Sequence, residues 1–365
     1  MATEVLDGVE QSPEKKKLAR RSAPDRSQRI RHMAQVFFVL LNVWIGAQFY
    51  LWVRFYELGG QGPALARPAG VEGWLPIAGL MNAKAFFLTG HVPIIHPAAM
   101  FLFMAFMLMS WLLKKAFCAW LCPVGTLSEA LWKLGRRLFG RTLQLPLALP
   151  KALDIPLRSL KYVLLGFFLL IVGGMPVESL NSFMATPYGL IADVKMLDFF
   201  RGLDVTAIVV LGILVLGSMA VQNFWCRYLC PYGAFMGLVS LLSPARMRRD
   251  REACIGCGKC AQACPAHLPV DQLVQIRSVE CTACMECVAV CPAEHALQLA
   301  LPPRRNTALA QRWFRRSLSP LAVAGLLATL FFGFVLVARA THHWRSPIPD
   351  DMYRYLIPNA GEVTH

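Results

Sequence analysis

Eight cysteines between residues 250 and 300 have the spacing of iron–sulfur ligands. The first run is Cys254-x2-Cys257-x2-Cys260-x3-Cys264-Pro265, and the second is Cys281-x2-Cys284-x2-Cys287-x3-Cys291-Pro292. In the bacterial two-cluster pattern, the fourth cysteine of each run binds the cluster of the other run. The spacing therefore predicts two [4Fe–4S] clusters. One is held by Cys254, Cys257, Cys260 and Cys291, and the other by Cys281, Cys284, Cys287 and Cys264.

Structural zinc is the main alternative for these cysteines. Zinc sites use separated CxxC pairs that supply four ligands to a tetrahedron. Three evenly spaced cysteines followed by Cys-Pro, repeated once, do not fit that plan. The sequence therefore favours clusters over zinc.

The other four cysteines form two CxxxCP motifs that match across an offset of 108 residues. Phe117-Cys-Ala-Trp-Leu-Cys-Pro-Val-Gly corresponds to Trp225-Cys-Arg-Tyr-Leu-Cys-Pro-Tyr-Gly. A spacing of four puts both thiols of a pair on one helix face, and the proline suits the first position of a following helix. That helix would present free N–H groups to a thiolate or sulfide. We expect Cys118, Cys122, Cys226 and Cys230 to form a further redox centre, either an iron–sulfur cluster or a dithiol pair. Buried structural thiols are the alternative.

The composition places these motifs in a membrane protein. The 365 residues are 56% apolar and 16% charged, with a mean hydropathy of +0.46. A soluble protein of this size carries about a quarter charged residues. Five apolar stretches are predicted to cross a bilayer, whose core needs about 20 helical residues. They are Met33–Val53, Pro97–Leu113, Tyr162–Val177, Val205–Val221 and Ser317–Ala338.

The basic residues indicate the orientation. Of the 37 Lys and Arg residues, 29 lie in residues 1–32, 114–161 and 223–317. The positive-inside rule predicts that these segments are cytoplasmic and that the C-terminus is external, in the periplasm. The net charge of +15 is thus an orientation signal. No basic module for nucleic acid is expected.

The predicted fold is mainly α, with about five membrane helices in two parallel helix–loop–helix repeats and an inserted cytoplasmic 2[4Fe–4S] ferredoxin domain. The expected division is a disordered basic N-terminus (1–32), repeat 1 (33–142), repeat 2 (143–249), the ferredoxin domain (250–300), a fifth helix (301–338) and a periplasmic tail (339–365). For the tail, partner docking and disorder are equal alternatives.

Paired CxxxCP motifs at membrane helix ends, combined with two ferredoxin motifs, resemble the NapH-type membrane polyferredoxins. The resemblance covers about residues 33–300; the fifth helix and external tail depart from it. It implies electron transfer between the quinol pool and a periplasmic or membrane redox partner, in a bacterial inner membrane. Such a partner would be a cytochrome or reductase subunit, or a second ferredoxin subunit. It also implies the role of a quinol dehydrogenase component, with quinol as substrate.

Quinol oxidation releases protons, so it needs titratable groups at the membrane edge. The external ends of the helices offer His91, His96 and Glu178, with Tyr188 and Asp193 nearby. We predict a quinol site there, against the alternative of ordinary interfacial polar residues. Two other functions stay open: an electron donor for metal reduction or cofactor maturation, and a redox-sensing membrane scaffold.

Overall fold

A computed structural model describes residue 21 and residues 25–140, 151–301 and 317–363. Most of the N-terminal segment that was expected to be disordered lies outside these residues. So do residues 141–150, between the two predicted repeats, and residues 302–316, before the fifth predicted helix.

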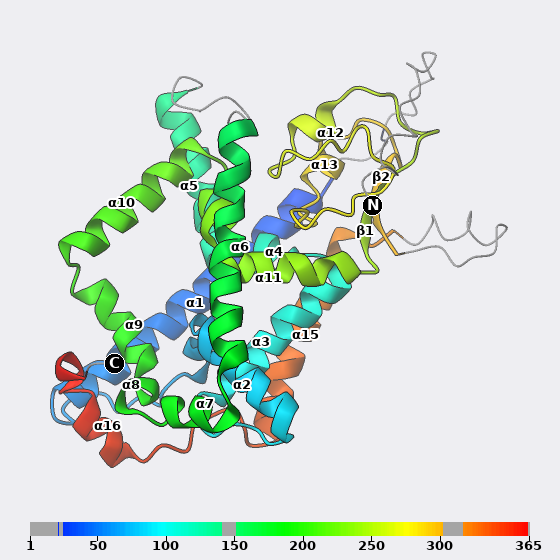
Figure 1. The fold of residues 1–365 in the computed structure, drawn as a ribbon. Coiled ribbons are helices and arrows are strands. Elements are labelled where there is room, and N and C mark those ends of the chain that lie inside the picture. Colours follow the sequence, from blue (N-terminus) through cyan, green and yellow to red (C-terminus); the bar gives the residue numbers. More distant parts are fainter. Residues whose placement is uncertain (1–20, 22–24, 141–150, 302–316, 364–365) are drawn as a thin grey trace.

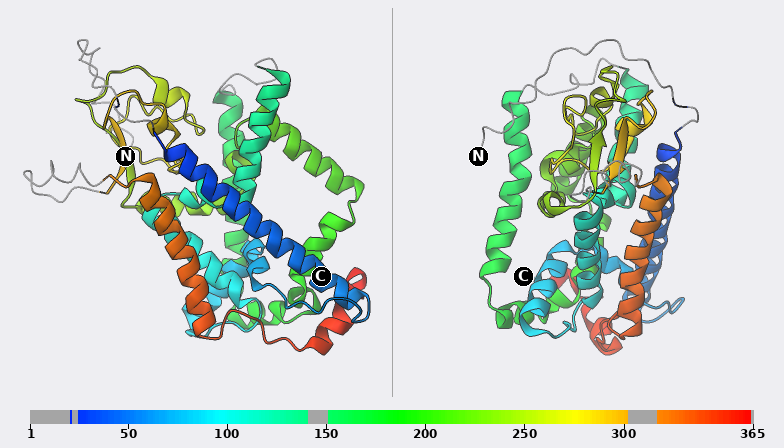
Figure 2. Two further views of the ribbon diagram at one scale, coloured as in Figure 1. Left: turned by 180° about the vertical axis from the view of Figure 1, so that it is seen from behind. Right: turned by 90° about the vertical axis from the view of Figure 1, so that its right-hand side faces the viewer.

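Within the described residues, three helices are long and apolar enough to cross a membrane: α1 (Ser27–Glu57), α6 (Lys151–Gly174) and α15 (Pro320–Ala340). They run between the two ends of the molecule in Figure 1, and α6 stands apart from the α1–α15 pair in Figure 2. Helix α1 begins at Ser27, before the expected start at residue 33. Its first turns are packed against the rest of the protein and are not a free tail. Arg31 and Gln35 are buried there, and Asp25 accepts a hydrogen bond from the Ser27 N–H at 2.9 Å.

The other two predicted spans are helices of different character. Helix α3 (Pro97–Leu113) has the predicted bounds, but its 17 residues are few for a span and most are buried. Helix α10 (Val205–Ala220) is largely exposed and makes an 82° bend with α9 (Ala192–Arg201). The bent pair is a candidate fourth span, and a five-span arrangement stays a prediction.

The end that was predicted to be external consists of short helices. They are η1 (Ala69–Trp74), α2 (Pro76–Thr89), α7 (Val177–Met184), α8 (Pro187–Leu190), α16 (Asp350–Leu356) and η4 (Ala360–Glu362). Trp52 of α1 packs edge-on against Tyr353 of α16 at 5.0 Å. The Lys84 ammonium caps the end of α6 by donating to the carbonyls of Val172 and Gly173 in its last turn and of Met175 just after it. The C-terminal tail is therefore folded onto this end as far as residue 363, so disorder does not describe it.

The opposite end carries the cysteine motifs. Its elements are α4 (Ala116–Trp120), α5 (Pro123–Phe139), the π-helix η2 (Trp225–Leu229), α11 (Pro231–Val239), η3 (Ser240–Leu242), β1 (Arg246–Arg249), α12 (Lys259–Gln262), α13 (Glu286–Ala289) and β2 (Leu297–Ala300). Strands β1 and β2 pair antiparallel and bracket the ferredoxin segment, with Arg246 opposite Ala300.

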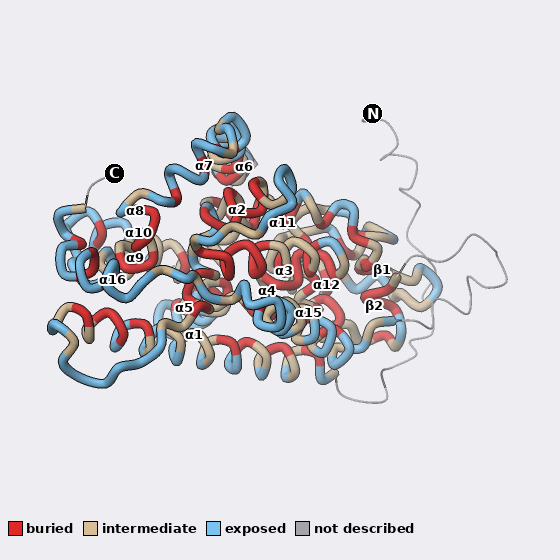
Figure 3. The backbone as a smooth tube through the Cα atoms, turned by 90° about the horizontal axis from the view of Figure 1, so that it is seen from below, coloured by how far each residue is buried: buried red, intermediate tan, exposed pale blue. Residues whose placement is uncertain are grey.

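One apolar core joins the ferredoxin segment to the helices below it. It includes Met109 of α3, Trp120 of α4, Val323 of α15, and Met247 and Val288 of the ferredoxin segment. In Figure 3 the buried residues gather along α3 and its neighbours, whereas α6 and α10 are mostly exposed. The ferredoxin segment is thus packed on the helical part and is not a tethered module.

Candidate redox site

The structure separates the eight ferredoxin cysteines into the two sets that the spacing predicts. Cys254, Cys257, Cys260 and Cys291 line one small cavity. Cys264, Cys281, Cys284 and Cys287 line a different and much larger one. Cys257 of the first set is exposed, whereas Cys281 and Cys287 of the second set are buried. The first set therefore lies near the surface and the second set near the helices.

The loops around the cysteines are bent tightly to achieve this. Ala283 and Met285, on either side of Cys284, have positive φ angles of 48° and 59°. Burial raises the pKa of Cys281 and Cys284, and hydrogen bonds from the backbone N–H groups of Ala283 and Glu286 oppose this rise by favouring the thiolates. Hydrogen bonds of this kind stabilise charged sulfur ligands.

The four CxxxCP cysteines line the same large cavity as the second ferredoxin set. This cavity has a volume of about 960 Å³. The second cysteine of each motif has the same place, because Cys122 and Cys230 are N-caps of α5 and α11 and are followed by Pro123 and Pro231 in the first helical position. The first cysteines differ, since Cys118 lies in the α-helix α4 and Cys226 in the π-helix η2. The N–H of Gly233 donates to Cys230 Sγ at 3.2 Å. Burial raises the pKa of Cys122 to about 11, and the N–H groups of Gly125 and Val124 oppose this rise.

The donor chemistry of all three cysteine groups fits [4Fe–4S] clusters. Each group offers four soft thiols around a cavity, with backbone N–H groups directed at some of the sulfurs. Thiolates are the ligands that iron–sulfur clusters require. Ligation by each cysteine nevertheless stays a prediction.

One hydrogen bond links the first CxxxCP motif to the second ferredoxin set. The Trp120 indole, which is fully buried, donates from Nε1 to the Ala283 carbonyl at 3.1 Å. Trp120 lies between Cys118 and Cys122, and Ala283 lies between Cys281 and Cys284. A short chain of covalent and hydrogen bonds therefore runs between the two cysteine groups.

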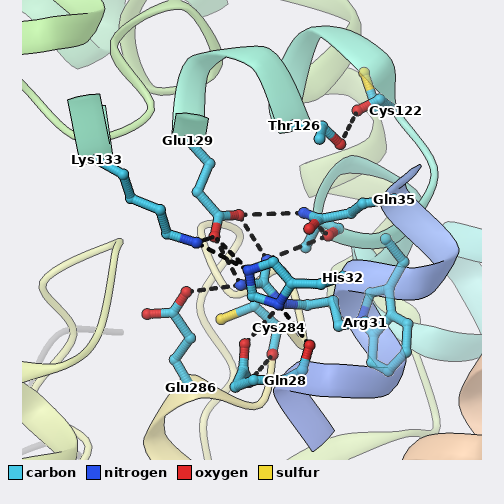
Figure 4. A network of polar contacts seen from close by, with 12 residues as sticks. Gln28, Arg31, His32, Gln35, Cys122, Thr126, Glu129, Lys133, Cys284 and Glu286 are labelled. Carbon is cyan, nitrogen blue, oxygen red and sulfur yellow. Dashed lines mark hydrogen bonds and ion pairs between the residues drawn. The ribbon is translucent and has the colours of Figure 1, made fainter. Parts of the chain in front are cut away.

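A buried ion network fixes the same elements from another side (Figure 4). Arg31 of α1 forms two hydrogen bonds with Glu129 of α5, at 2.7 and 2.9 Å, and a third with Glu286 of α13 at 3.0 Å. Lys133 also contacts Glu129, at 2.7 Å. Burial opposes ionisation of Glu129, but Arg31 and Lys133 prevail and lower its pKa to about 2.

This role of Arg31 is not expected from the sequence, which predicts that residues 1–32 are a disordered tail. One signal was available: Glu129 and Lys133 are four apart on a helix that also carries a CxxxCP motif, the spacing of an ion pair. Arg31, the further partner of this ion pair, could not be identified without the fold.

The three residues of the predicted quinol site are not brought together. His96 is fully buried in a network with Glu72, Arg67 and Asp193, in which Arg67 contacts Asp193 at 2.6 Å and Glu72 at 2.8 Å. Burial opposes charge on the His96 imidazole, but Glu72 outweighs it and raises the pKa of His96. Glu178 and His91 are exposed, and none of these three predicted residues lines the large cavity.

Comparison with known proteins accounts for the cysteine motifs. A family model described as a 4Fe-4S binding domain matches residues 95–142 and 203–249, each of which contains one CxxxCP motif. A 4Fe-4S dicluster domain model matches residues 246–292. The chain is 48% identical, over 337 residues, to "Putative electron transport protein YccM" of Escherichia coli (strain K12), which covers 92% of this chain and 91% of that protein. The chain belongs to this family of ferredoxin-type electron transport proteins.

More distant relatives carry the same kind of name. Over 153 residues the chain is 27% identical to "Ferredoxin-type protein NapH" of Escherichia coli (strain K12), covering 42% of this chain and 48% of that protein. It is 28% identical over 199 residues to "Methylamine utilization ferredoxin-type protein MauN" of Methylorubrum extorquens, covering 53% and 62%. No solved structure matches. The resemblance to NapH-type polyferredoxins is thus confirmed.

Proposed function

We propose that this protein passes electrons from membrane quinol to a redox partner through its cysteine-bound centres. Iron–sulfur clusters, when bound, supply one-electron transfer over a wide range of potentials. Two clusters would be held by the ferredoxin sets, and a further redox centre by Cys118, Cys122, Cys226 and Cys230.

The observation that carries the proposal is the extent of the large cavity. From the CxxxCP thiols it continues along α1, past Phe38 and Leu41, to Trp44 and to Trp74 of η1. Trp44 is 70% exposed and Trp74 40%, so the cavity reaches the outer surface of the helices. Apolar cavities between helices are common sites for apolar ligands. A quinol could therefore enter from the lipid and place its ring beside the thiols.

This cavity supports a different position for the quinol from that expected at His91, His96 and Glu178. Oxidation of a quinol releases two electrons and two protons. At the ferredoxin end, the walls carry Arg31 and Glu129, which are buried, and Glu286, which is half-buried; these polar groups would hydrogen-bond the ring hydroxyls. The two electrons would leave one at a time through the thiol-bound centres. The protons would leave one at a time by way of Glu286, the carboxylate of this wall whose pKa burial raises.

The arrangement of the cysteine groups supports an ordered route for the electrons, from the CxxxCP centre through the second ferredoxin set to the first. The CxxxCP thiols share a cavity with the second ferredoxin set, and Trp120 and Arg31 hold both in place. The first set, with the exposed Cys257, would be the exit to a partner. The distribution of basic residues supports a cytoplasmic position for this end in a bacterial inner membrane.

The test is reduction of the centres by quinol in purified protein, handled without oxygen in lipid nanodiscs. We expect a soluble quinol analogue to bleach the visible absorbance of the clusters. Leu41→Trp, which fills the cavity, should slow this bleaching at least tenfold, whereas dithionite should still reduce the variant fully. Leu40→Trp is the matched control because Leu40 is 63% exposed on the same helix. Clusters that dithionite reduces and quinol does not would overturn the proposal.

A further inference from the structure

Three lysines at the ferredoxin end have buried ammonium groups. The exposed fractions of Lys114, Lys115 and Lys161 are 0%, 3% and 0%. Lysines at a membrane surface ordinarily bury the stem and keep the charged head in water. These three do not, so an ordinary anchoring role does not explain them.

The carboxylates present do not balance these charges. Glu280 contacts Lys161 at 2.6 Å and Lys115 at 3.7 Å. Among the described residues it is the carboxylate that pairs with Lys115 and Lys161, whereas the Lys114 ammonium has no hydrogen-bond partner there. Three cations thus face one anion. An uncompensated buried charge is costly, so a further anion is expected next to them.

Two of the lysines lie at the cavity that the cysteine groups line, because Lys115 lines it and Lys161 pairs with Glu280, which also lines it. The charge of Lys115 acts on Cys118, Cys226 and Cys230 of the CxxxCP motifs and also on Cys281 of the second ferredoxin set. Lys161 acts on Cys118 and Cys230. Lys114 acts on Cys281. Lys115, Glu280 and all these cysteines line the large cavity.

We infer that Lys115 and Lys161 are the counter-charges of an anionic [4Fe–4S] centre held by Cys118, Cys122, Cys226 and Cys230. This inference rests on the proposed function and decides between the two centres that the sequence leaves open. Four thiolates outweigh the positive charge of the iron–sulfur core, so such a centre is a net anion and becomes more so on reduction. A pair of disulfides is neutral and would leave the ammonium groups uncompensated. Lys114 has the corresponding role at the second ferredoxin set.

Lys115 is the most informative of the three because it faces both cysteine groups. A cation beside a centre that gains negative charge on reduction favours the reduced state and raises the reduction potential. The position that matches Lys115 across the offset of 108 is Asn223. Only the first CxxxCP segment therefore supplies this charge.

The experiment measures iron content and reduction potentials of the full chain in nanodiscs, by an electron paramagnetic resonance titration without oxygen. We expect about 12 iron atoms per wild-type chain, the content of three [4Fe–4S] clusters. In Lys115→Met, which keeps the stem and loses the charge, the potential of the CxxxCP centre should fall most and that of the second ferredoxin cluster less. Lys115→Arg should restore most of the difference. Lys195→Met, at the opposite end of the molecule, should change neither potential.

Two results would overturn the inference. One is about 8 iron atoms in the wild type, with the four CxxxCP thiols titrating as disulfides. The other is equal potentials in Lys115→Met and the wild type. If Lys115→Met does not fold, Lys161→Met supplies the same comparison at the CxxxCP centre alone. Quinol-dependent reduction of the two ferredoxin clusters is measured separately. Either of these results would therefore contradict the inference about the lysines without contradicting the proposed function.

Discussion

The two CxxxCP segments have nearly the same sequence motif and different surroundings. In the first segment, α3 is a core helix, and twelve of its residues are buried. In the second, α10 contributes only Ala207 and Ser218 to the buried residues. After the motifs, α5 continues for 17 residues and α11 for nine. The first segment is thus built into the protein core, while the second lies at its edge, although both bring a cysteine pair to one cavity.

The shared motif therefore determines the position of the sulfurs but not the surroundings of each segment. Cys122 and Cys230 have closely similar backbone angles, with φ of −67° and −75° and ψ of 118° and 102°. The aromatic residues between the cysteines point to different partners. Trp120 donates to the ferredoxin segment, whereas Tyr228 donates to Asp154 of α6 at 2.8 Å. Each CxxxCP segment is therefore hydrogen-bonded to a different part of the protein, the first to the ferredoxin segment and the second to α6.

The largest expected effect tests whether the two pairs form one centre. Cys118→Ser and Cys226→Ser should each remove about four iron atoms per chain, because a cluster that loses one ligand is usually lost. The double variant should also lose about four, since both changes remove the same centre. Iron and acid-labile sulfide analysis measures this. Losses that add up in the double variant would mean two independent sites, one in each segment.

Next in size is the difference between the two apolar helices. Met109 of α3 is fully buried, and Met109→Ala should lower the free energy of unfolding by about 2–5 kcal/mol. Ile213 of α10 is 57% exposed, and Ile213→Ala should cost less than about 1 kcal/mol because lipid can fill the space. Thermal unfolding in one detergent compares them. Equal costs would mean that α10 is buried against a partner.

A smaller difference is expected between two glycines that share a place in the motif. A Cβ at Gly125 would clash with the Cys118 carbonyl oxygen, whereas at Gly233 the nearest atom is Cys230 Sγ at 3.5 Å. Gly125→Ala should therefore destabilise the protein by about 1–3 kcal/mol and disturb the centre, because the helix must move. Gly233→Ala should leave stability and iron content nearly unchanged. Similar behaviour of both variants would contradict the asymmetry.

Much of this arrangement could be predicted from local sequence. The cysteine spacing anticipates the two ferredoxin sets, since ligand geometry is imposed by the cluster and not by distant packing. Pro123 and Pro231 likewise anticipate the helix starts, because a proline in the first turn loses no hydrogen bond.

Features set by tertiary packing could not be predicted. Hydropathy gave α3 and α10 the same interpretation, because a core helix and a lipid-facing helix are equally apolar. His96 was predicted to belong to a quinol site at the external helix ends. The fold buries it with Glu72 and Arg67, which lie more than 20 residues away in the sequence and are not part of a local motif. Arg31 was assigned to a tail because its partners Glu129 and Glu286 are nearly 100 and more than 250 residues away.

The smallest effect concerns the aromatic residues that attach each segment. Trp120→Phe keeps most of the packing and removes the donor to the Ala283 carbonyl, a buried acceptor whose loss of partner costs about 1–3 kcal/mol. Hydrogen–deuterium exchange should rise in residues 281–287 and stay unchanged in α6. Tyr228→Phe should show the opposite pattern, with faster exchange around Asp154, because that carboxylate then loses the phenol donor and keeps only its arginine partners, Arg227 and Arg158. If both variants loosened the ferredoxin segment equally, the two motifs would be attached alike. The proposed difference between the first segment, in the core, and the second, at its edge, would then not hold at Trp120 and Tyr228.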